Sequence, residues 1–114
     1  MSNCIFCKII SGDIPSTKVY EDESSLVFKD INPVAPVHLV AIPKAHCEAV
    51  HCVPSNSPDA IAKLFATVAT VVKQLNLDKL GYRLVVNSGE SAGQTVPHVH
   101  VHILSGRDLT WPPG

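Results

Sequence analysis

The chain of 114 residues has almost no net charge and no long hydrophobic run. Its formal charge of −1 gives no electrostatic reason to expect binding to nucleic acid or to an anionic membrane. No apolar stretch approaches the ~18 residues of a membrane-spanning helix. The N-terminal residues lack a basic segment followed by a long apolar one, so we expect no signal peptide.

The sequence also lacks internal repeats and low-complexity segments. Its length is that of one domain, which we expect to span residues 1–114. An apolar fraction of 46% is enough for a hydrophobic core in a chain of this size.

The four cysteines are expected in a reducing compartment, the cytoplasm with the nucleus as a second location, because no export signal is present. Metal binding or free thiols are then favoured over disulfides. The Cys4-x-x-Cys7 pair supplies only two of the four ligands of a structural zinc site, and two buried thiols are the alternative. The pairs His46-Cys47 and His51-Cys52 offer further ligands, but spacing does not select among them.

Hydrophobic periodicity predicts two helices and five strands. A short helix over 4–10 ends at Gly12 and Pro15, and a long one of about 18 residues begins at Ser57-Pro58 and ends near Asn76. The apolar stripe of the long helix is either core or a dimer face. The predicted strands are 18–21 and 25–29, joined as a hairpin, then 37–43, 82–87 and 98–104.

The last strand carries three of the six histidines, His98, His100 and His102, at every second position. Side chains alternate across a strand, so these rings share one face, roughly 7 Å apart, while the intervening valines face the core. An ordinary half-exposed strand is the alternative. Upstream, the polar loop 87–95 contains two glycines and can present backbone N–H groups to an anion. Together the loop and the histidines indicate phosphate chemistry.

The motif His98-Val-His100-Val-His102-Ile-Leu resembles the signature of the histidine triad (HIT) superfamily. Further motifs are similar to the Hint branch, the nucleotide-binding proteins once called protein kinase C inhibitors: 5–10 (IFCKII), 28–31 (FKDI), 36–38 (PVH), 42–44 (IPK), 85–87 (VVN), 93–96 (GQTV) and 111–114 (WPPG). The resemblance implies a small α+β fold with an antiparallel sheet of about five strands and one long and one short helix. It also implies a homodimer across which the sheet continues, with the long helix at the interface.

The resemblance implies hydrolysis of purine nucleoside 5′-phosphoramidates, an adenosine phosphoramidase activity, through a nucleotidylated histidine. His100 matches the nucleophile, His102 would donate to phosphate oxygens and His38 would support them. A neutral imidazole near pH 7 is nucleophilic when its second nitrogen is held by an acceptor. The implied partners are purine nucleotides, namely AMP and its phosphoramidates, and no organic cofactor is expected.

The resemblance also assigns substrate-binding residues. Asp30 would accept from the ribose hydroxyls, and Asn87 would touch the phosphate or ribose. Trp111 would lie near the partner's active site and influence the leaving group. The base pocket would be Ile5, Phe6, Ile9, Phe28 and Ile31, and the phosphate cradle Gly93, Gln94, Thr95, His100 and His102. Thr95 replaces the serine common in Hint proteins and adds a methyl group to the hydroxyl.

The Cys-x-x-Cys pair departs from the familiar animal Hint proteins and is similar to members that bind zinc. That similarity implies a structural zinc site formed by Cys4, Cys7, His46 and His98. Cys47, His51 and Cys52 would then be ordinary residues.

Three other functions remain open from the sequence. One is a nucleotide-binding or scaffolding module with weak or vestigial catalysis. Another is a dinucleoside polyphosphate hydrolase of a neighbouring HIT branch. The third is a catalytic zinc ion held by two of the strand histidines together with His38.

Overall fold

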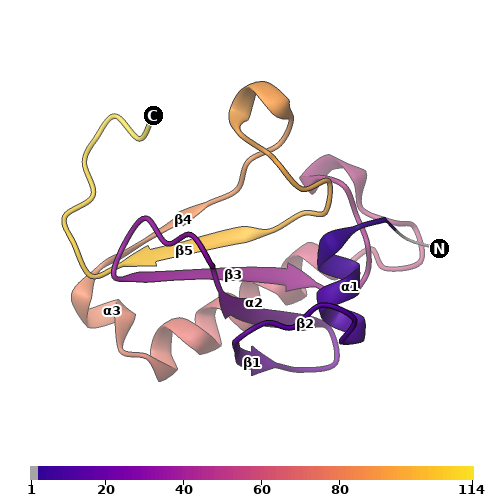
Figure 1. Ribbon diagram of the computed structural model, residues 1–114, viewed down its shortest axis with the longest axis horizontal. Helices are drawn as coiled ribbons and strands as arrows, with labels where there is room; N and C mark the ends of the chain where they lie inside the picture. Colours follow the sequence, from indigo (N-terminus) through magenta and orange to yellow (C-terminus); the bar gives the residue numbers. More distant parts are fainter. Residues whose placement is uncertain (1–2) are drawn as a thin grey trace.

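An antiparallel sheet of five strands, in the order β1-β2-β3-β5-β4, forms the centre of the molecule (Figure 1). The computed structural model describes residues 3–114; Met1 and Ser2, part of the stretch in which no signal peptide is expected, lie outside the described residues. The elements are α1 (Ile5–Ser11), β1 (Lys18–Glu21), β2 (Ser25–Lys29), β3 (Val37–Pro43), η1 (Val50–Cys52), α2 (Ala60–Gln74), α3 (Leu77–Leu80), β4 (Tyr82–Val85), η2 (Glu90–Ala92) and β5 (Val101–Ser105). This arrangement confirms the predicted α+β fold.

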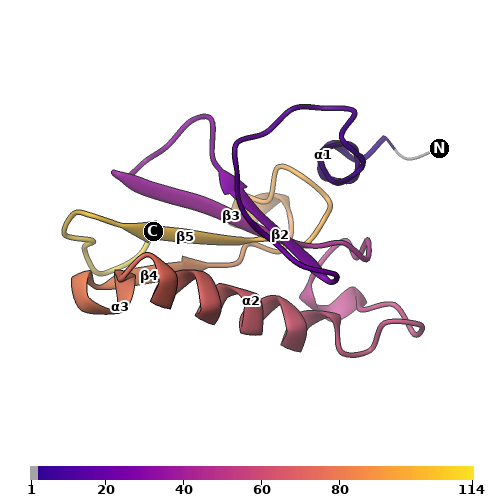
Figure 2. The same ribbon diagram turned by 90° about the horizontal axis from the view of Figure 1, so that it is seen from below.

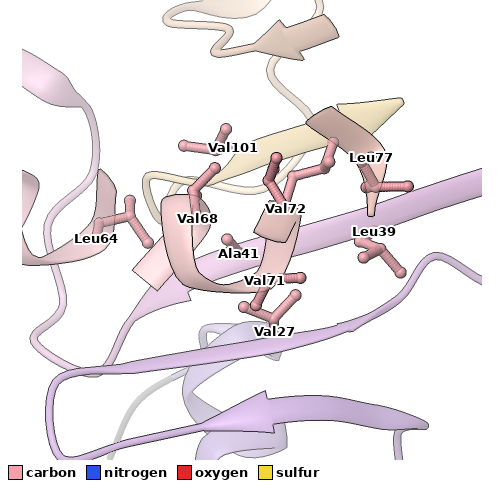
Figure 3. Close-up of a cluster of buried hydrophobic side chains, with 10 residues drawn as sticks. Val27, Leu39, Ala41, Leu64, Val68, Val71, Val72, Leu77 and Val101 are labelled. Atoms are coloured by element: carbon pink, nitrogen blue, oxygen red, sulfur yellow. The ribbon is translucent and has the colours of Figure 1, made fainter. Parts of the chain in front are cut away.

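Helix α2 lies along one face of the sheet and buries the main hydrophobic core (Figure 2). Its buried residues Leu64, Val68 and Val71 pack against alternate residues of the central strands (Figure 3). The complete cluster is Val27, Leu39, Ala41, Leu64, Val68, Val71, Val72, Leu77, Val101 and Ile103. Each large side chain buried in this way stabilises the fold by roughly 1.5–3 kcal/mol, so this layer fixes the sheet on which the site is built.

Helix α1 lies on the opposite side of the sheet from α2 (Figure 2). The Cys4 thiol caps its N-terminus by accepting from the Cys7 backbone N–H at 3.4 Å, and Gly12 ends it in the left-handed region with φ 88°. A second apolar cluster forms beneath it from Cys4, Phe6, Ile9, Leu26, Phe28, Val40 and Ile42. This packing brings Cys4, the N-cap, and Cys7 to the end of the central strand β3.

The predicted face of the histidines is confirmed. Val101 and Ile103 belong to the cluster under α2. His102 pairs in register with Val40 of β3, which packs in the cluster under α1. Side-chain alternation therefore separates the core layer from the layer that carries the histidine rings.

The predicted start of the last strand at His98 is wrong. The ladder between β3 and β5 runs only from Val37 with Ser105 to Ala41 with Val101. The Val99 N–H instead donates to the Cys47 backbone carbonyl at 2.7 Å. His98 and His100 therefore lie on irregular backbone just before β5, where a loop contact has replaced strand pairing.

The helices and β4 also differ from the prediction: α1 is Ile5–Ser11 rather than 4–10, and β4 ends at Val85 rather than at residue 87. Helix α2 begins at Ala60 with Asp59 at the N-cap, because a turn with Ala60 N–H donating to Ser57 O at 3.1 Å precedes it, and it has 15 residues. The short helix α3 was not predicted; it follows Asn76, whose positive φ of 57° breaks the end of α2. Within residues 3–114, no helix has the length and apolar character needed to cross a bilayer.

Candidate functional site

His100 is held in one tautomer by the backbone. Its ring is buried and packs edge-on against Phe6 and His102, with centroid distances of 5.1 and 5.0 Å. His100 Nδ1 lies 2.8 Å from the His98 carbonyl oxygen. A carbonyl can only accept, so a neutral ring carries its proton on Nδ1 and leaves a lone pair on Nε2. The ring is therefore prepared as a nucleophile through Nε2.

His38 and His102 form a hydrogen-bonded pair, and the Val34 backbone N–H determines which ring donates. The Val34 N–H donates to His38 Nδ1 at 3.1 Å, so the proton of neutral His38 resides on Nε2. His38 Nε2 lies 2.9 Å from His102 Nδ1 and 3.4 Å from Asp30 Oδ2. The shorter contact makes His102 Nδ1 an acceptor, and the proton of neutral His102 is then on Nε2. The pair thus gives His102 a fixed N–H donor on its far side.

The electrostatic surroundings keep His102 neutral. Its pKa is lowered to about 4, mainly by burial and also by the neighbouring His100 and His38 rings, whereas Asp30 acts in the opposite direction. At neutral pH the ring therefore acts as a hydrogen-bond donor without a charge.

A cavity of about 310 Å³ opens beside these rings. Asp30 faces it with Oδ1 already accepting from the Asn32 N–H at 2.8 Å. The predicted residues that line it are Ile5, Phe6, Ile9, Phe28, Asp30, Ile31, Thr95, His100 and His102. The lining residues that sequence reasoning missed are Ile14, Pro15, Ser16, Lys29, Asn32, Val40 and Val96. Three of these seven, Ile14, Pro15 and Ser16, come from the segment after α1, where no periodicity or motif marks them.

The loop before the histidines is held by Gln94. Its carboxamide oxygen accepts from the Gly89 N–H at 2.8 Å, and its Nε2 donates to the Glu48 and Val96 carbonyls at 2.7 and 3.1 Å. All polar groups of this side chain are engaged with backbone, so Gln94 shapes the loop rather than facing the cavity.

The other predicted substrate residues stand apart from the cavity lining. The Asn87 amide lies beside Gly93, since a Cβ placed on Gly93 would be 3.8 Å from Asn87 Nδ2. Trp111 in the C-terminal tail is 81% exposed and does not line the cavity. Its predicted role depends on a second subunit.

The four predicted metal ligands converge at the end of the sheet where the central strand β3 finishes. The ligand atoms of Cys4, Cys7, His46 and His98 all lie within 4.8 Å of one another. His98 Nδ1 is 3.2 Å from Cys4 Sγ, 3.6 Å from Cys7 Sγ and 3.1 Å from His46 Nδ1, and Cys7 Sγ is 3.4 Å from His46 Nδ1. Tetrahedral zinc, bonded at about 2.3 Å to sulfur and 2.0–2.1 Å to nitrogen, separates its ligands by about 3.3–3.8 Å. The cluster therefore fits zinc closely.

The outer contact of His98 supports the same conclusion. His98 Nε2 lies 2.9 Å from the Pro43 carbonyl, so the proton is on Nε2 and the Nδ1 lone pair points to the thiols. Burial lowers the pKa of His98 to about 4, which keeps this ring neutral as a ligand must be. Cys47, His51 and Cys52 are not part of the cluster.

Asp30, His38 and His102 form a second compact group of metal-ligating residue types. A metal on His38 Nε2 would leave the ring proton on Nδ1, directly opposite the Val34 N–H that now donates to it. Two donors would then face each other at 3.1 Å. This group fits proton transfer and hydrogen bonding rather than metal binding, which argues against the catalytic zinc alternative.

This arrangement of histidines occurs in a known family. A family model described as HIT domain matches residues 11–109. The chain belongs to the HIT family. Among its HIT relatives, the 14 kDa zinc-binding protein of Brassica juncea is 45% identical over 112 residues, covering 96% of this chain and 98% of that protein. The corresponding protein of Zea mays is 46% identical over 121 residues, covering 99% and 89%.

Solved HIT structures share the fold closely. A HIT family hydrolase from Legionella pneumophila Philadelphia 1 superposes with a TM-score of 0.91 at 44% identity. The match covers 98% of this chain and 100% of that chain. The histidine triad nucleotide-binding protein from Candida albicans gives a TM-score of 0.83 at 37% identity, covering 96% and 83%. These matches confirm the HIT fold predicted from the sequence motifs.

Proposed function

We propose that this HIT protein is a purine nucleoside 5′-phosphoramidate hydrolase that acts through a nucleotidyl-histidine intermediate. The observation that carries the proposal is the bond between His100 Nδ1–H and the His98 carbonyl at 2.8 Å. It leaves the Nε2 lone pair of a neutral imidazole on the side of the ring where substrate would bind. His100 also lines a cavity whose walls are largely apolar.

In the first step His100 Nε2 attacks the α-phosphorus, a P–N bond to His100 forms and the P–N bond to the substrate amine breaks. The amine takes up one proton from solvent as it leaves, and the water that attacks in the second step returns one proton to solvent. The His98 carbonyl then stabilises the positive charge that the phosphorylated imidazole carries on Nδ1–H. In the second step water attacks the same phosphorus, the bond to Nε2 breaks and a nucleoside 5′-monophosphate is released.

His102 and His38 stabilise the charge on the transferred group. His102 Nε2–H donates to a phosphate oxygen, and the bond from His38 Nε2–H polarises His102 in that direction. Asp30 takes the ribose hydroxyls, and Thr95 with the backbone of Gly93 completes the phosphate cradle. Both imidazoles must be neutral for this, in agreement with the low pKa of His102, about 4.

Cys4, Cys7, His46 and His98 hold a structural zinc ion in this proposal, as the names of the plant relatives suggest. When bound, zinc supplies a crosslink between the first turn of α1, the loop after β3 and the segment before β5. A thiolate-containing site is consistent with a reducing location, the cytoplasm or the nucleus.

We also propose a homodimer that pairs the free edge of β4. Strand β4 lies at one end of the sheet order, with β5 on one side only (Figure 1). The exposed apolar residues Phe65, Leu80 and Tyr82 belong to β4 and the helices next to it. Such an edge pairs readily with a second copy, which would bring another tail with Trp111 to the assembly. Sedimentation of the protein at micromolar concentration tests this, and a monomer would contradict it.

The activity is tested with adenosine 5′-phosphoramidate on wild type, His100→Ala and the control His51→Ala, whose exposed ring lies outside both clusters. We expect AMP release by wild type and by His51→Ala and a loss of at least about 10³-fold in His100→Ala. One adenylyl group should be trapped on wild type by rapid denaturation at alkaline pH, because the P–N bond to histidine is labile in acid. Equal turnover by His100→Ala would refute the proposal. AMP binding without turnover would indicate a nucleotide-binding module. Turnover restricted to dinucleoside polyphosphates would indicate the dinucleoside polyphosphate hydrolase of the neighbouring HIT branch.

A further inference from the structure

The hydroxyl of Ser16 is an unpaired polar group in the wall of the substrate cavity. Among residues 3–114, Ser16 Oγ is the one buried side-chain nitrogen or oxygen without a hydrogen-bond partner. The residue lines the cavity that holds His100 and His102. Buried hydroxyls are nearly always paired, so an exception in a ligand cavity points to a partner supplied by the ligand.

The backbone around Ser16 is fixed on both sides. The Ile14 N–H donates to the Lys8 carbonyl of α1 at 3.2 Å, and the Thr17 carbonyl accepts from the Lys29 N–H of β2 at 3.0 Å. Pro15 restricts the backbone between them further. The only freedom left to the Ser16 hydroxyl is rotation about its Cα–Cβ bond, which can turn it toward the cavity at small cost.

Four other polar residues of the cavity already have roles in the proposed reaction, whereas Lys29 and Asn32, which also line it, have none. His100, His102 and Thr95 serve the phosphate, and Asp30 serves the ribose. The lining also contains apolar side chains, among them Ile9, Ile14 and Phe28, as suits the faces of a flat aromatic base. A nucleobase between such walls still presents polar atoms along its edge, and those atoms need partners.

We infer that Ser16 hydrogen-bonds the edge of the nucleobase and thereby contributes to base selection. A hydroxyl both donates and accepts, so it can donate to a ring nitrogen or accept from an exocyclic amine of a purine. The inference rests on the proposed function, since it takes the cavity to be a nucleotide site. It assigns the hydroxyl to the base rather than to the sugar or phosphate.

The test compares Ser16→Ala with wild type in three measurements: affinity for AMP, affinity for ribose 5-phosphate, and the melting temperature without ligand. We expect AMP to bind about fivefold more weakly to Ser16→Ala and ribose 5-phosphate to bind equally to both. The ligand-free variant should melt no lower than wild type, because it loses a buried group that had no partner.

Ser105→Ala is the matched control, because Ser105 is also buried but donates to the Gly81 carbonyl at 2.6 Å. It should melt lower than wild type and bind AMP normally. Unchanged AMP affinity in Ser16→Ala would overturn the inference, as would an equal loss for ribose 5-phosphate. Failure of wild type to bind AMP would overturn the proposed function together with it, whereas AMP binding without hydrolysis would leave the role of Ser16 intact.

Discussion

The two histidine clusters in this molecule use the same ring tautomer at His98 and at His38, with the proton on Nε2, but a different backbone group fixes it in each. In the metal cluster the Pro43 carbonyl accepts from His98 Nε2–H, so the Nδ1 lone pair points to the thiols at 3.2–3.6 Å. In the active-site cluster the Val34 N–H donates to His38 Nδ1, so the proton is on Nε2 and points to His102. One backbone acceptor produces a metal ligand, and one backbone donor produces a hydrogen-bond donor. The chemistry of His98 and of His38 is therefore decided by a single backbone group beside each ring.

The two clusters are joined through His98 and His100. His98 offers its ring to the metal cluster and its carbonyl oxygen to His100 Nδ1 at 2.8 Å. A change at the proposed metal site would reach His100, the proposed nucleophile, through this one residue. Substitutions that disrupt one cluster at a time test whether the metal cluster is structural and the other cluster catalytic, as their hydrogen bonds indicate.

Removal of zinc is the largest disruption. We expect wild type to contain one equivalent of zinc and Cys4→Ser less than a tenth. A ligand present at about 1,000 times its Kd stabilises a fold by about 4 kcal/mol, so loss of zinc should lower the melting temperature by roughly 10–20 °C. Elemental analysis and thermal unfolding with and without chelator measure both quantities.

Cys52→Ser is the control, because Cys52 is exposed and lies outside the metal cluster. It should retain one equivalent of zinc. A second equivalent in wild type that disappears in His38→Phe would contradict the assignment of Asp30, His38 and His102 to hydrogen bonding.

The next largest effect is expected from His38→Phe, which keeps the ring shape and removes both nitrogens. His102 Nδ1 then loses its donor, and the His102 proton is no longer held on the side that faces phosphate. We expect kcat for adenosine 5′-phosphoramidate to fall by about 10²-fold, with KM changed only a few-fold and zinc content unchanged. A fall confined to KM would mean that His38 only shapes the binding site.

The sequence predicted the residues of both clusters but not the features that distinguish them. Alternation placed the histidines on one face, and the resemblance to zinc-containing HIT proteins selected His46 and His98 over other ligand candidates. The groups that fix the tautomers, Val34 N–H and Pro43 O, are backbone atoms, and any residue other than proline at position 34 carries the same N–H. Their positions follow from the fold and have no sequence signature.

Two other features were not predicted because they also depend on contacts between residues that are distant in the sequence. The strand was predicted from His98 because its alternation continues there, but the Cys47 carbonyl captures the Val99 N–H. Ser16 has no motif, and only the absence of a partner in the folded chain marks it. Local pattern specifies faces and element types, whereas contacts between distant loops decide where pairing stops.

A smaller effect is expected on the pH dependence of the unfolding free energy, which depends on the buried ring of His102. The pKa of His102 is about 4 in the fold because the ring is buried, against 6.5 in the unfolded chain. Between pH 6.5 and pH 4, His102 is protonated in the unfolded chain but neutral in the fold. The free energy of unfolding is therefore highest at pH 7 and above, and it falls as the pH is lowered toward 4. We expect wild type to lose about 1–2 kcal/mol more than His102→Phe between pH 7 and pH 5. Urea unfolding at each pH measures the difference. Loss of zinc at low pH affects wild type and His102→Phe alike and cancels in the comparison. Parallel plots of unfolding free energy against pH for the two proteins would contradict the low pKa of His102.

The smallest effect concerns Gln94, the side chain that ties the loop of the metal ligand His46 to the loop before the histidines. Gln94→Glu keeps an acceptor for the Gly89 N–H but places an anionic oxygen against the Glu48 and Val96 carbonyls, where Nε2 now donates. Two favourable contacts become repulsive, and the loop should move away from the metal loop. We expect AMP to bind about three- to fivefold more weakly while zinc content stays at one equivalent. Gln74→Glu makes the same charge change on an exposed residue of α2 and should bind AMP as wild type does. If both variants lost affinity equally, charge alone would explain the result; if Gln94→Glu lost zinc as well, the two clusters would be less separate than their hydrogen bonds indicate.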